Sequence, residues 1–151
     1  MYTTLLLLHS WIRWIALVAI VGATLAAVRG KVQGNDSLAD RWGLFAVTAL
    51  DLQMLLGLIL YFVVSPNMQA IRANFGASMK DPQARFWAVE HLTAMLVAVV
   101  LVHVGRVLAR KAKTPAAKRT RLLICFGIAT VAVFLGTPWP GMAAGRPLFR
   151  V

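Results

Sequence analysis

Four long apolar runs decide more than any other feature what this 151-residue chain can fold into. They cover about residues 5–28, 43–64, 86–109 and 122–138. An α-helix of about 20 apolar residues crosses the hydrocarbon core of a bilayer. Because every backbone amide and carbonyl there must be paired within the protein, runs of this length favour helices over barrel strands. The sequence therefore predicts an all-α integral membrane protein, a four-helix bundle formed by residues 1–151 as one transmembrane domain.

The composition agrees with a membrane protein and excludes several other classes. Hydrophobic residues make up 60% of the chain and charged residues 14%, compared with about 45–50% and about 25% in soluble domains. The net charge of +11 does not indicate nucleic-acid binding, because the basic residues lie between the apolar runs, where anionic lipid head groups attract them. Cys125 is the single cysteine, so no intrachain disulfide forms. The motifs for covalent haem (CxxCH) and for a CxxC zinc pair are absent.

The basic residues predict the orientation of the bundle. Residues 106–121 carry seven basic residues and no acidic one, and residues 29–42 carry three basic residues. Connections rich in Lys and Arg remain in the cytoplasm. We therefore expect both connections in the cytoplasm and both chain termini outside, together with Arg146 and Arg150 of the tail. The stronger basic connection is expected to hold anionic lipid or acidic partner loops rather than to do chemistry.

The connection between the second and third runs has an apolar pattern of its own. Met68, Ile71, Phe75 and Met79 follow one another at intervals of three or four residues. This spacing places them on one face of a helix. We expect an interfacial helix over residues 67–80.

Ionisable residues within the apolar runs are the candidate functional residues, because each is costly in lipid and needs a partner or a role. They are His9, Arg13, Asp51, Glu90, His91 and His103. His9 and His91 each lie a few residues into runs that cross in the same direction, so they share a depth near the outer face. Two such imidazoles can ligate the iron of a b-type haem from both sides, and bundle cores hold such cofactors. In the other interpretation, each histidine bonds a neighbour or meets head groups.

Arg13 also has two interpretations. It follows His9 by four residues and therefore lies on the same helix face. An Arg guanidinium suits a haem propionate, but it suits equally an intramembrane salt bridge to Asp51 or Glu90, with Gln53 in the same polar seam.

His103 is expected to differ from the other two histidines. It lies 12 residues after His91, which is about 18 Å along a helix and roughly 120° around it. We expect a buried, hydrogen-bonded side chain or a polar contact near the inner face, rather than a second pair of haem ligands.

Four segments together resemble a family of small bacterial four-helix membrane proteins described as cytochrome b-like. These segments are LLLLHSWIRWIALV, LDLQMLLGLILYFVVSP, FWAVEHLTAMLVAVVLVHVGR and TPWPGMAAGRPLFR. The resemblance implies a b-haem bundle in the inner membrane of a bacterium, within a respiratory or photosynthetic chain. His9, Arg13, Glu90, His91 and His103 match the pattern of the family. Asp51 departs from it, since relatives carry a histidine there, so this chain lacks one candidate ligand.

Three functions follow as hypotheses. The first is an electron-transfer subunit of a larger complex, with one haem b held by His9 and His91, a propionate at Arg13, and a quinone as redox partner. The second is a cofactor-free accessory subunit that binds lipid and other membrane subunits. The third, a transporter or proton relay using Arg13, Asp51 and Glu90, is disfavoured because the sequence has no broken-helix pair and no inverted repeat. The sequence favours an electron-transfer or accessory subunit over a stand-alone enzyme.

Overall fold

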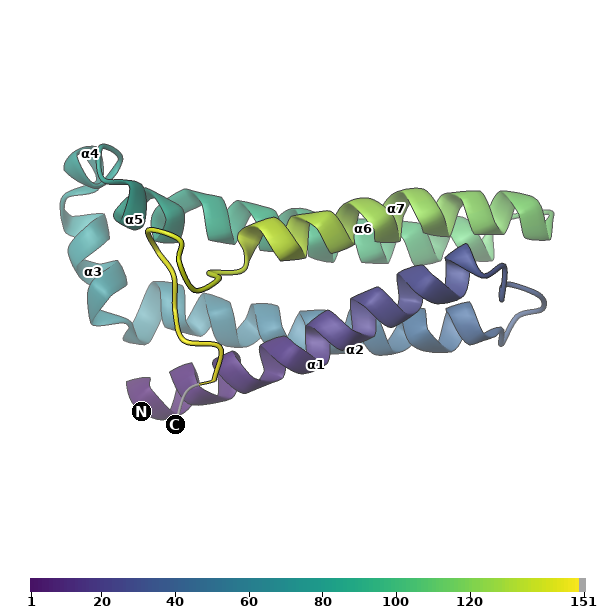
Figure 1. Cartoon of the computed structure of the whole chain (residues 1–151), viewed down its shortest axis with the longest axis horizontal. Coiled ribbons are helices and arrows are strands. Elements are labelled where there is room, and N and C mark those ends of the chain that lie inside the picture. Colours follow the sequence, from purple (N-terminus) through teal and green to yellow (C-terminus); the bar gives the residue numbers. More distant parts are fainter. Residues whose placement is uncertain (150–151) are drawn as a thin grey trace.

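The computed structural model describes residues 1–149, which form helices and no strand. Four helical segments run the length of the molecule (Figure 1). They are α1 (Tyr2–Val28), α2 (Leu38–Ile59) continued by the π-helical turn η1 (Leu60–Val64), the π-helical turn η2 (Phe86–Glu90) continued by α6 (His91–Arg110), and α7 (Pro115–Gly136). Three short helices, α3 (Pro66–Ala73), α4 (Phe75–Ser78) and α5 (Pro82–Arg85), connect η1 to η2. The expected all-α architecture is confirmed, with four helices long and apolar enough to cross a membrane.

Two of the long helices, α2 and α7, begin before their apolar runs, because polar residues that cap their N-termini precede those runs. Ser37 begins α2: its hydroxyl accepts a hydrogen bond from the backbone amide of Asp40, and the Asp40 carboxylate accepts one from the amide of Ser37. Thr114 caps α7 in the same way through the amide of Ala117, with Pro115 in the first turn. Such caps satisfy amides that have no partner within the helix. The second and fourth helices therefore begin before residues 43 and 122, where their apolar runs begin.

The four long helices pack in a ring. α1 packs against α2 and α7, and α6 packs against the same two helices. α1 and α6 therefore lie diagonally across the bundle. Small side chains fill much of the α1 side of the core, and the ring of Phe126 on α7 is fully buried. Larger apolar side chains point outward, as they do in bundles surrounded by lipid; examples are Val18, Leu55, Val100 and Val131.

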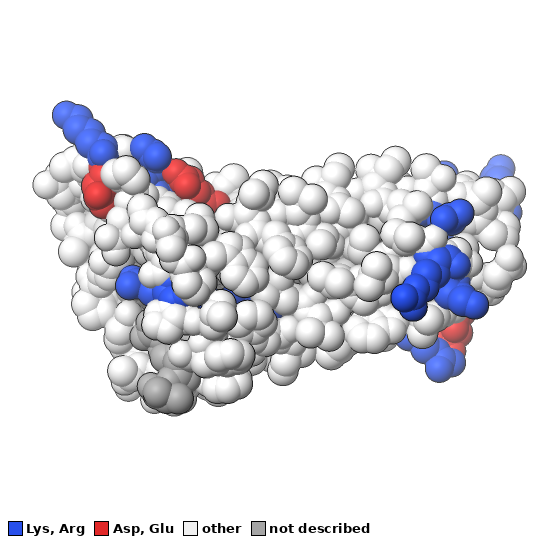
Figure 2. Space-filling view, viewed as in Figure 1, with Lys and Arg blue, Asp and Glu red and all other residues white. Residues whose placement is uncertain are grey.

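The two ends of the bundle differ in composition. At one end, here called the terminal end, lie the start of α1, the tail up to residue 149 and α3–α5 (Figure 1). At the other, the basic end, lie the connections between α1 and α2 and between α6 and α7. On the face shown in Figure 2, charged side chains gather at the two ends, and a long uncharged band separates them. Arg150, which was expected at the same end as Arg146, lies outside the described residues.

The expected interfacial helix over residues 67–80 is not continuous. Asn74 has φ −134° and ψ 56°, which ends α3 before α4 begins. Met68 and Ile71 are buried against Ala88 of the bundle itself, while Phe75 is exposed. Met79 packs partly buried against the same cluster, so all of these apolar residues except Phe75 pack within the protein.

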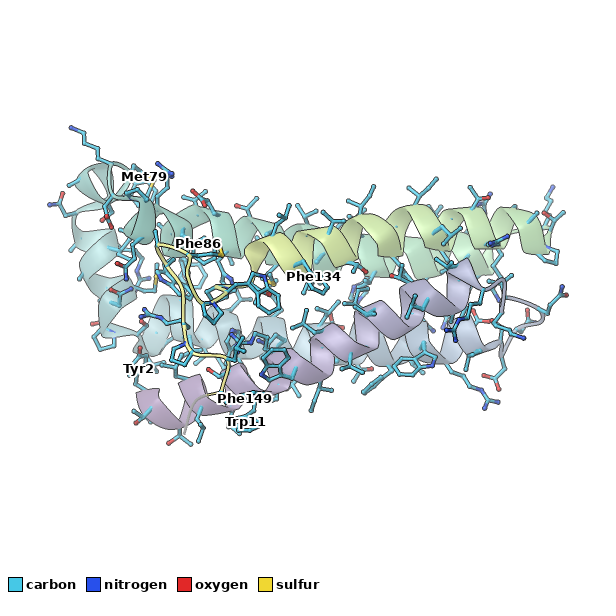
Figure 3. All side chains as sticks on the ribbon, viewed as in Figure 1. Tyr2, Trp11, Met79, Phe86, Phe134 and Phe149 are labelled. Atoms are coloured by element: carbon cyan, nitrogen blue, oxygen red, sulfur yellow. The ribbon has the colours of Figure 1, made fainter. Side chains whose placement is uncertain are left out.

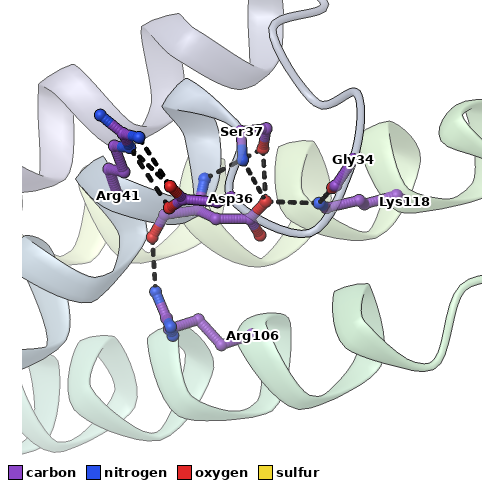
Figure 4. A network of polar contacts seen from close by, with 7 residues as sticks. Gly34, Asp36, Ser37, Arg41, Arg106 and Lys118 are labelled. Atoms are coloured by element: carbon purple, nitrogen blue, oxygen red, sulfur yellow. Dashed lines mark hydrogen bonds and ion pairs between the residues drawn. The ribbon is translucent and has the colours of Figure 1, made fainter.

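Several basic residues at the basic end are bound within the protein (Figure 4). The ammonium of Lys118 is buried and lies 2.5 Å from a carboxylate oxygen of Asp40 and 2.8 Å from the carbonyl of Gly34. Arg106 donates to the carbonyl of Asp40.

Arg119 and Arg121 donate to carbonyls at the ends of α1 and α6. These side chains satisfy helix ends. The surface available to lipid or a partner is therefore smaller than the seven charges suggested, and it centres on the exposed residues Arg110, Lys111 and Lys113.

Candidate functional site

The structure brings together His9 and His91, the two histidines expected to share a depth. They lie on the diagonal helices α1 and α6 and face each other across the interior of the terminal end. Their ring centroids are 6.3 Å apart, and the ring planes are inclined by 71°. The remaining features of the site surround this pair.

His91 is held in a defined orientation. Its Nδ1 lies 2.6 Å from the carbonyl oxygen of Gly136 on α7. Because a carbonyl only accepts, Nδ1 carries the proton, and in the neutral ring Nε2 keeps its lone pair. Gly136 permits this contact, because a Cβ there would lie 2.7 Å from the Cβ of Ala94. The rings of Phe86 and Trp87 lie 5.9 and 5.4 Å from the His91 ring. A histidine that donates one ring N–H to a backbone carbonyl has the arrangement typical of a metal ligand.

His9 is held by α2. The side-chain amide of Gln53 donates to the His9 backbone carbonyl at 3.0 Å and lies 3.2 Å from His9 Nε2. Gly57, one turn further along α2, leaves room for the ring, since a Cβ there would lie 3.1 Å from His9 Cε1. Nδ1 of His9 is buried and has no hydrogen-bond partner in the described part of the chain.

A cavity of about 150 Å³ adjoins the two rings. Three of the side chains that line it have buried polar atoms without a hydrogen-bond partner among residues 1–149: His9 Nδ1, Gln53 Oε1 and Trp87 Nε1. Native proteins pair nearly all such atoms, so each unpaired one needs an explanation. Their concentration around one cavity indicates a site that holds a ligand or ordered water.

Both π-helical turns adjoin the cavity. Tyr61 of η1 and Trp87 of η2 contribute to its wall. The hydroxyl of Tyr61 donates to the carbonyl of Ala88 at 2.8 Å, which joins the two turns. Such turns are rare and occur frequently at functional sites.

The C-terminal tail covers the terminal end of the bundle (Figure 1). Arg13 and the indole N–H of Trp14 both donate to the carbonyl of Leu148, at 2.8 and 3.1 Å. The ring of Phe149 lies against Trp11 and Trp14 (Figure 3). Arg146 lies over the ring of Trp87, 5.2 Å from its centroid. Arg13 and Arg146 both line the cavity.

The expected salt bridges of Arg13 are not formed within the described residues. Glu90 pairs with Arg85 instead, at 2.8 Å, because both lie near the end of the helix that contains η2. Asp51 contacts His103, because the Asp51 side chain lies on the outer surface of α2 rather than in the interior. Of the residues expected in one polar seam, His9, Arg13 and Gln53 line the cavity, whereas Asp51 and Glu90 do not.

His103 makes a polar contact, as expected, but it is not buried. Its Nε2 lies 3.4 Å from a carboxylate oxygen of Asp51, and about half of each side chain is exposed. It lies far from the cavity along α6 and takes no part in that site.

Neither a metal-binding cluster nor a similarity to known proteins adds to this description of the site. The described residues contain no group of three or more His, Cys, Asp or Glu side chains that could hold a metal ion. No protein-family model, curated protein or solved structure matches this chain.

Proposed function

We propose that the protein is a small membrane b-type cytochrome in which His9 and His91 would hold the iron of one haem. The facing imidazoles carry this proposal. A ligating imidazole nitrogen lies about 2 Å from its metal, and the ring centre about 1 Å further away. Two imidazoles that hold one metal ion between them would therefore have their centroids about 6 Å apart, and the separation here is 6.3 Å.

The residues around the pair fit this role. A haem with two histidine ligands supplies one-electron transfer. Gly136 fixes the ring of His91 through its carbonyl, and Gln53 holds His9 from α2. Arg13 and Arg146 supply guanidinium groups at the cavity, and such groups bind carboxylates such as propionates well.

The macrocycle of a haem requires more space than this cavity offers. The cavity has about 150 Å³, whereas pockets for organic ligands have about 300–1,000 Å³. Haem insertion therefore has to move part of the wall. The tail forms part of that wall through Arg146 and Pro147. Its contacts with the bundle include the hydrogen bonds to Leu148, the stacking of Phe149 and the contact of Arg146 with Trp87.

A haem held by His9 and His91 would supply one-electron exchange with a quinone within a larger membrane complex. The indole N–H of Trp87 is a buried donor without an acceptor among the described side chains and backbone. A quinone carbonyl is an acceptor of that kind. The same proposal places the protein in the cytoplasmic membrane of a bacterium.

The test is the absorption spectrum of the purified protein and three variants. The wild-type protein should give a reduced-minus-oxidised difference spectrum with b-type bands. His9→Ala and His91→Ala should each abolish the low-spin signal, whereas His103→Ala, far from the cavity, should retain it. A protein that needs His103 but not His9 would contradict the pairing.

The second candidate is a cofactor-free accessory subunit that contacts lipid and partner helices. The small cavity favours it, as does the direct edge-to-face packing of His9 on His91. An iron-free, colourless preparation that reconstituted haem does not alter would establish this function in place of the first.

A further inference from the structure

The contact between Asp51 and His103 is unusual for its position in the bundle. Asp51 lies at the midpoint of the helical segment Leu38–Val64, 13 residues from either end. At about 1.5 Å per residue this is about 20 Å from each end, within the depth of a hydrocarbon core about 30 Å thick. Nevertheless the Asp51 side chain is 46% exposed and that of His103 is 49% exposed. Ionisable residues at this depth almost always face the interior of their bundle.

The two side chains satisfy each other incompletely. Nδ1 of His103 lies 2.9 Å from the carbonyl of Val99 and must therefore donate to it. Only Nε2 remains for Asp51, and the separation of 3.4 Å is long for a hydrogen bond. The Asp51 carboxylate has no hydrogen bond to any other described residue. By contrast, Asp40 at the basic end makes bonds of 2.5 Å to Ser37 and to Lys118.

Lipid tails cannot complete this contact, because an unpaired carboxylate in hydrocarbon costs several kcal/mol. The surface needs a partner that brings a donor for Asp51 and an acceptor for His103, both at the same depth. A second copy of this chain has both groups. In a two-fold dimer with its axis along the membrane normal, every residue of one copy lies at the same depth as in the other.

We infer that the face of α2 and α6 around Asp51 and His103 is a homodimer interface. Each Asp51 accepts a hydrogen bond from Nε2–H of the other copy's His103 in its imidazolium form, while Nδ1–H still donates to the Val99 carbonyl. The patch is therefore its own complement. Apolar side chains surround the exchanged pair one turn away: Leu55 on α2, and Val100 and Val107 on α6, each at least half exposed. Polar contacts between helices in this apolar setting favour association. The interface does not involve the cavity and does not depend on haem.

Single-cysteine cross-linking tests the interface in the membrane. The native Cys125 is buried on α7, so Cys125→Ala removes the background thiol. Leu55→Cys and Val107→Cys place a thiol beside the pair. Val18→Cys on α1 and Val131→Cys on α7, 59% and 57% exposed, are the matched controls. We expect disulfide-linked dimers from the first two variants and not from the controls. Equal cross-linking at all four positions, or none at any, would overturn the interface.

Exchanging the residues at positions 51 and 103 distinguishes a homodimer from a complex with a different protein. Asp51→Leu or His103→Leu should reduce cross-linking at residue 55 by about 5- to 30-fold, the effect of losing about 1–2 kcal/mol of interhelical contact. The double variant Asp51→His with His103→Asp keeps both groups but exchanges their positions, so a homodimer should re-form. This variant also retains the polar composition, in case a single variant fails to fold. Failure of the exchange to restore cross-linking, or a different protein cross-linked at residue 55, would contradict the homodimer.

Discussion

At the residue scale, the site depends on which nitrogen of each histidine is engaged. The carbonyl of Gly136 accepts a hydrogen bond from Nδ1–H of His91, so Nε2 remains available to the cavity. For His9 the engaged nitrogen is Nε2, next to Gln53, and Nδ1 is the buried atom without a partner. The two rings are therefore held by opposite nitrogens, from two different neighbouring helices.

Gln53 is expected to be a positioning residue for His9. Gln53→Leu keeps the volume of the side chain but removes both donors to His9. Because the loss of such outer partners typically weakens metal binding about 10–100-fold, we expect haem affinity to fall by about tenfold or more. Titration of haem into the apoprotein, followed in the Soret band, measures this. Thr48→Val is the control, since the Thr48 hydroxyl bonds only to its own helix; an equal loss in both variants would contradict the role.

Gly57 is expected to be required for space beside the His9 ring. Gly57→Val would press against Cε1, where a Cβ alone already lies at 3.1 Å. Overpacking of this kind costs about 1–3 kcal/mol, and the displaced ring should also lose the haem signal. Gly127→Val on α7 is the matched control, because nothing lies within 4 Å of a Cβ there. Thermal unfolding in detergent and the absorption spectrum together distinguish the two variants.

At the element scale, the connection between α1 and α2 is held in place by side chains from the other two long helices. Lys118 of α7 and Arg106 of α6 both bond to Asp40 at the start of α2. The pair formed by Asp36 and Arg41 lies on the surface instead. There the Arg41 guanidinium, through its hydrogen bonds, holds the pKa of Asp36 below its usual value. Any stability from that surface pair is lost only as the pH falls through this lowered pKa.

The two pairs should differ strongly in their contribution to stability. Lys118→Met leaves Asp40 in a largely buried position without its cation, and removing one partner of a buried pair costs about 3–5 kcal/mol. The midpoint of thermal unfolding should fall accordingly. Asp36→Asn breaks an exposed pair and should leave the midpoint nearly unchanged. Similar midpoints for the two variants would contradict the structural role of Lys118.

At the scale of the whole molecule, the two ends of the bundle differ in charge, and this difference predicts how the protein lies in the membrane. The basic end presents Arg110, Lys111 and Lys113 to the surroundings even after the bound residues are set aside. The terminal end carries charges of both signs within residues 72–90. From the positive-inside rule we predict that the basic end lies in the cytoplasm.

The orientation is tested with reporters fused after residue 151. Alkaline phosphatase, active only outside the cytoplasm, should be active there, and a cytoplasm-dependent fluorescent protein should not be. Reporters fused within residues 111–114 should give the reverse result. A fusion after residue 151 that is active only in the cytoplasm would exclude this topology.

Removing the exposed positive charges should affect association with lipid and spare the site. Arg110→Gln with Lys111→Gln and Lys113→Gln removes three charges, each worth about 1 kcal/mol of attraction to an anionic surface. Retention on anionic vesicles should fall, while the absorption spectrum stays unchanged, because the site is at the opposite end. Lys118→Gln alone should instead lower thermal stability. If that variant weakened retention on vesicles as much as the triple variant does, the distinction between bound and exposed basic residues would be contradicted.

Apolar length and charge placement by themselves determined that this chain forms four long helices with its charges at the two ends. Both are properties of local sequence: a run of about 20 apolar residues is recognised without knowing its neighbours. The shared depth of His9 and His91 followed equally from counting residues along two helices. Helix starts were less predictable, since Ser37 and Thr114 extend α2 and α7 into the polar connections.

Only the tertiary structure decided which polar side chains meet. Depth in a bundle follows from residue number, but rotation about each helix axis follows from packing against neighbours. The side chain of Asp51 faces outward and contacts His103, and Glu90 pairs with Arg85 near the helix end. Neither carboxylate therefore pairs with Arg13. The partners of the site, the Gly136 carbonyl, Trp87 and the tail at Leu148, lie up to 135 positions away from the residues they contact. No local pattern encodes such contacts, because they exist only once α1, α6, α7 and the tail have packed together.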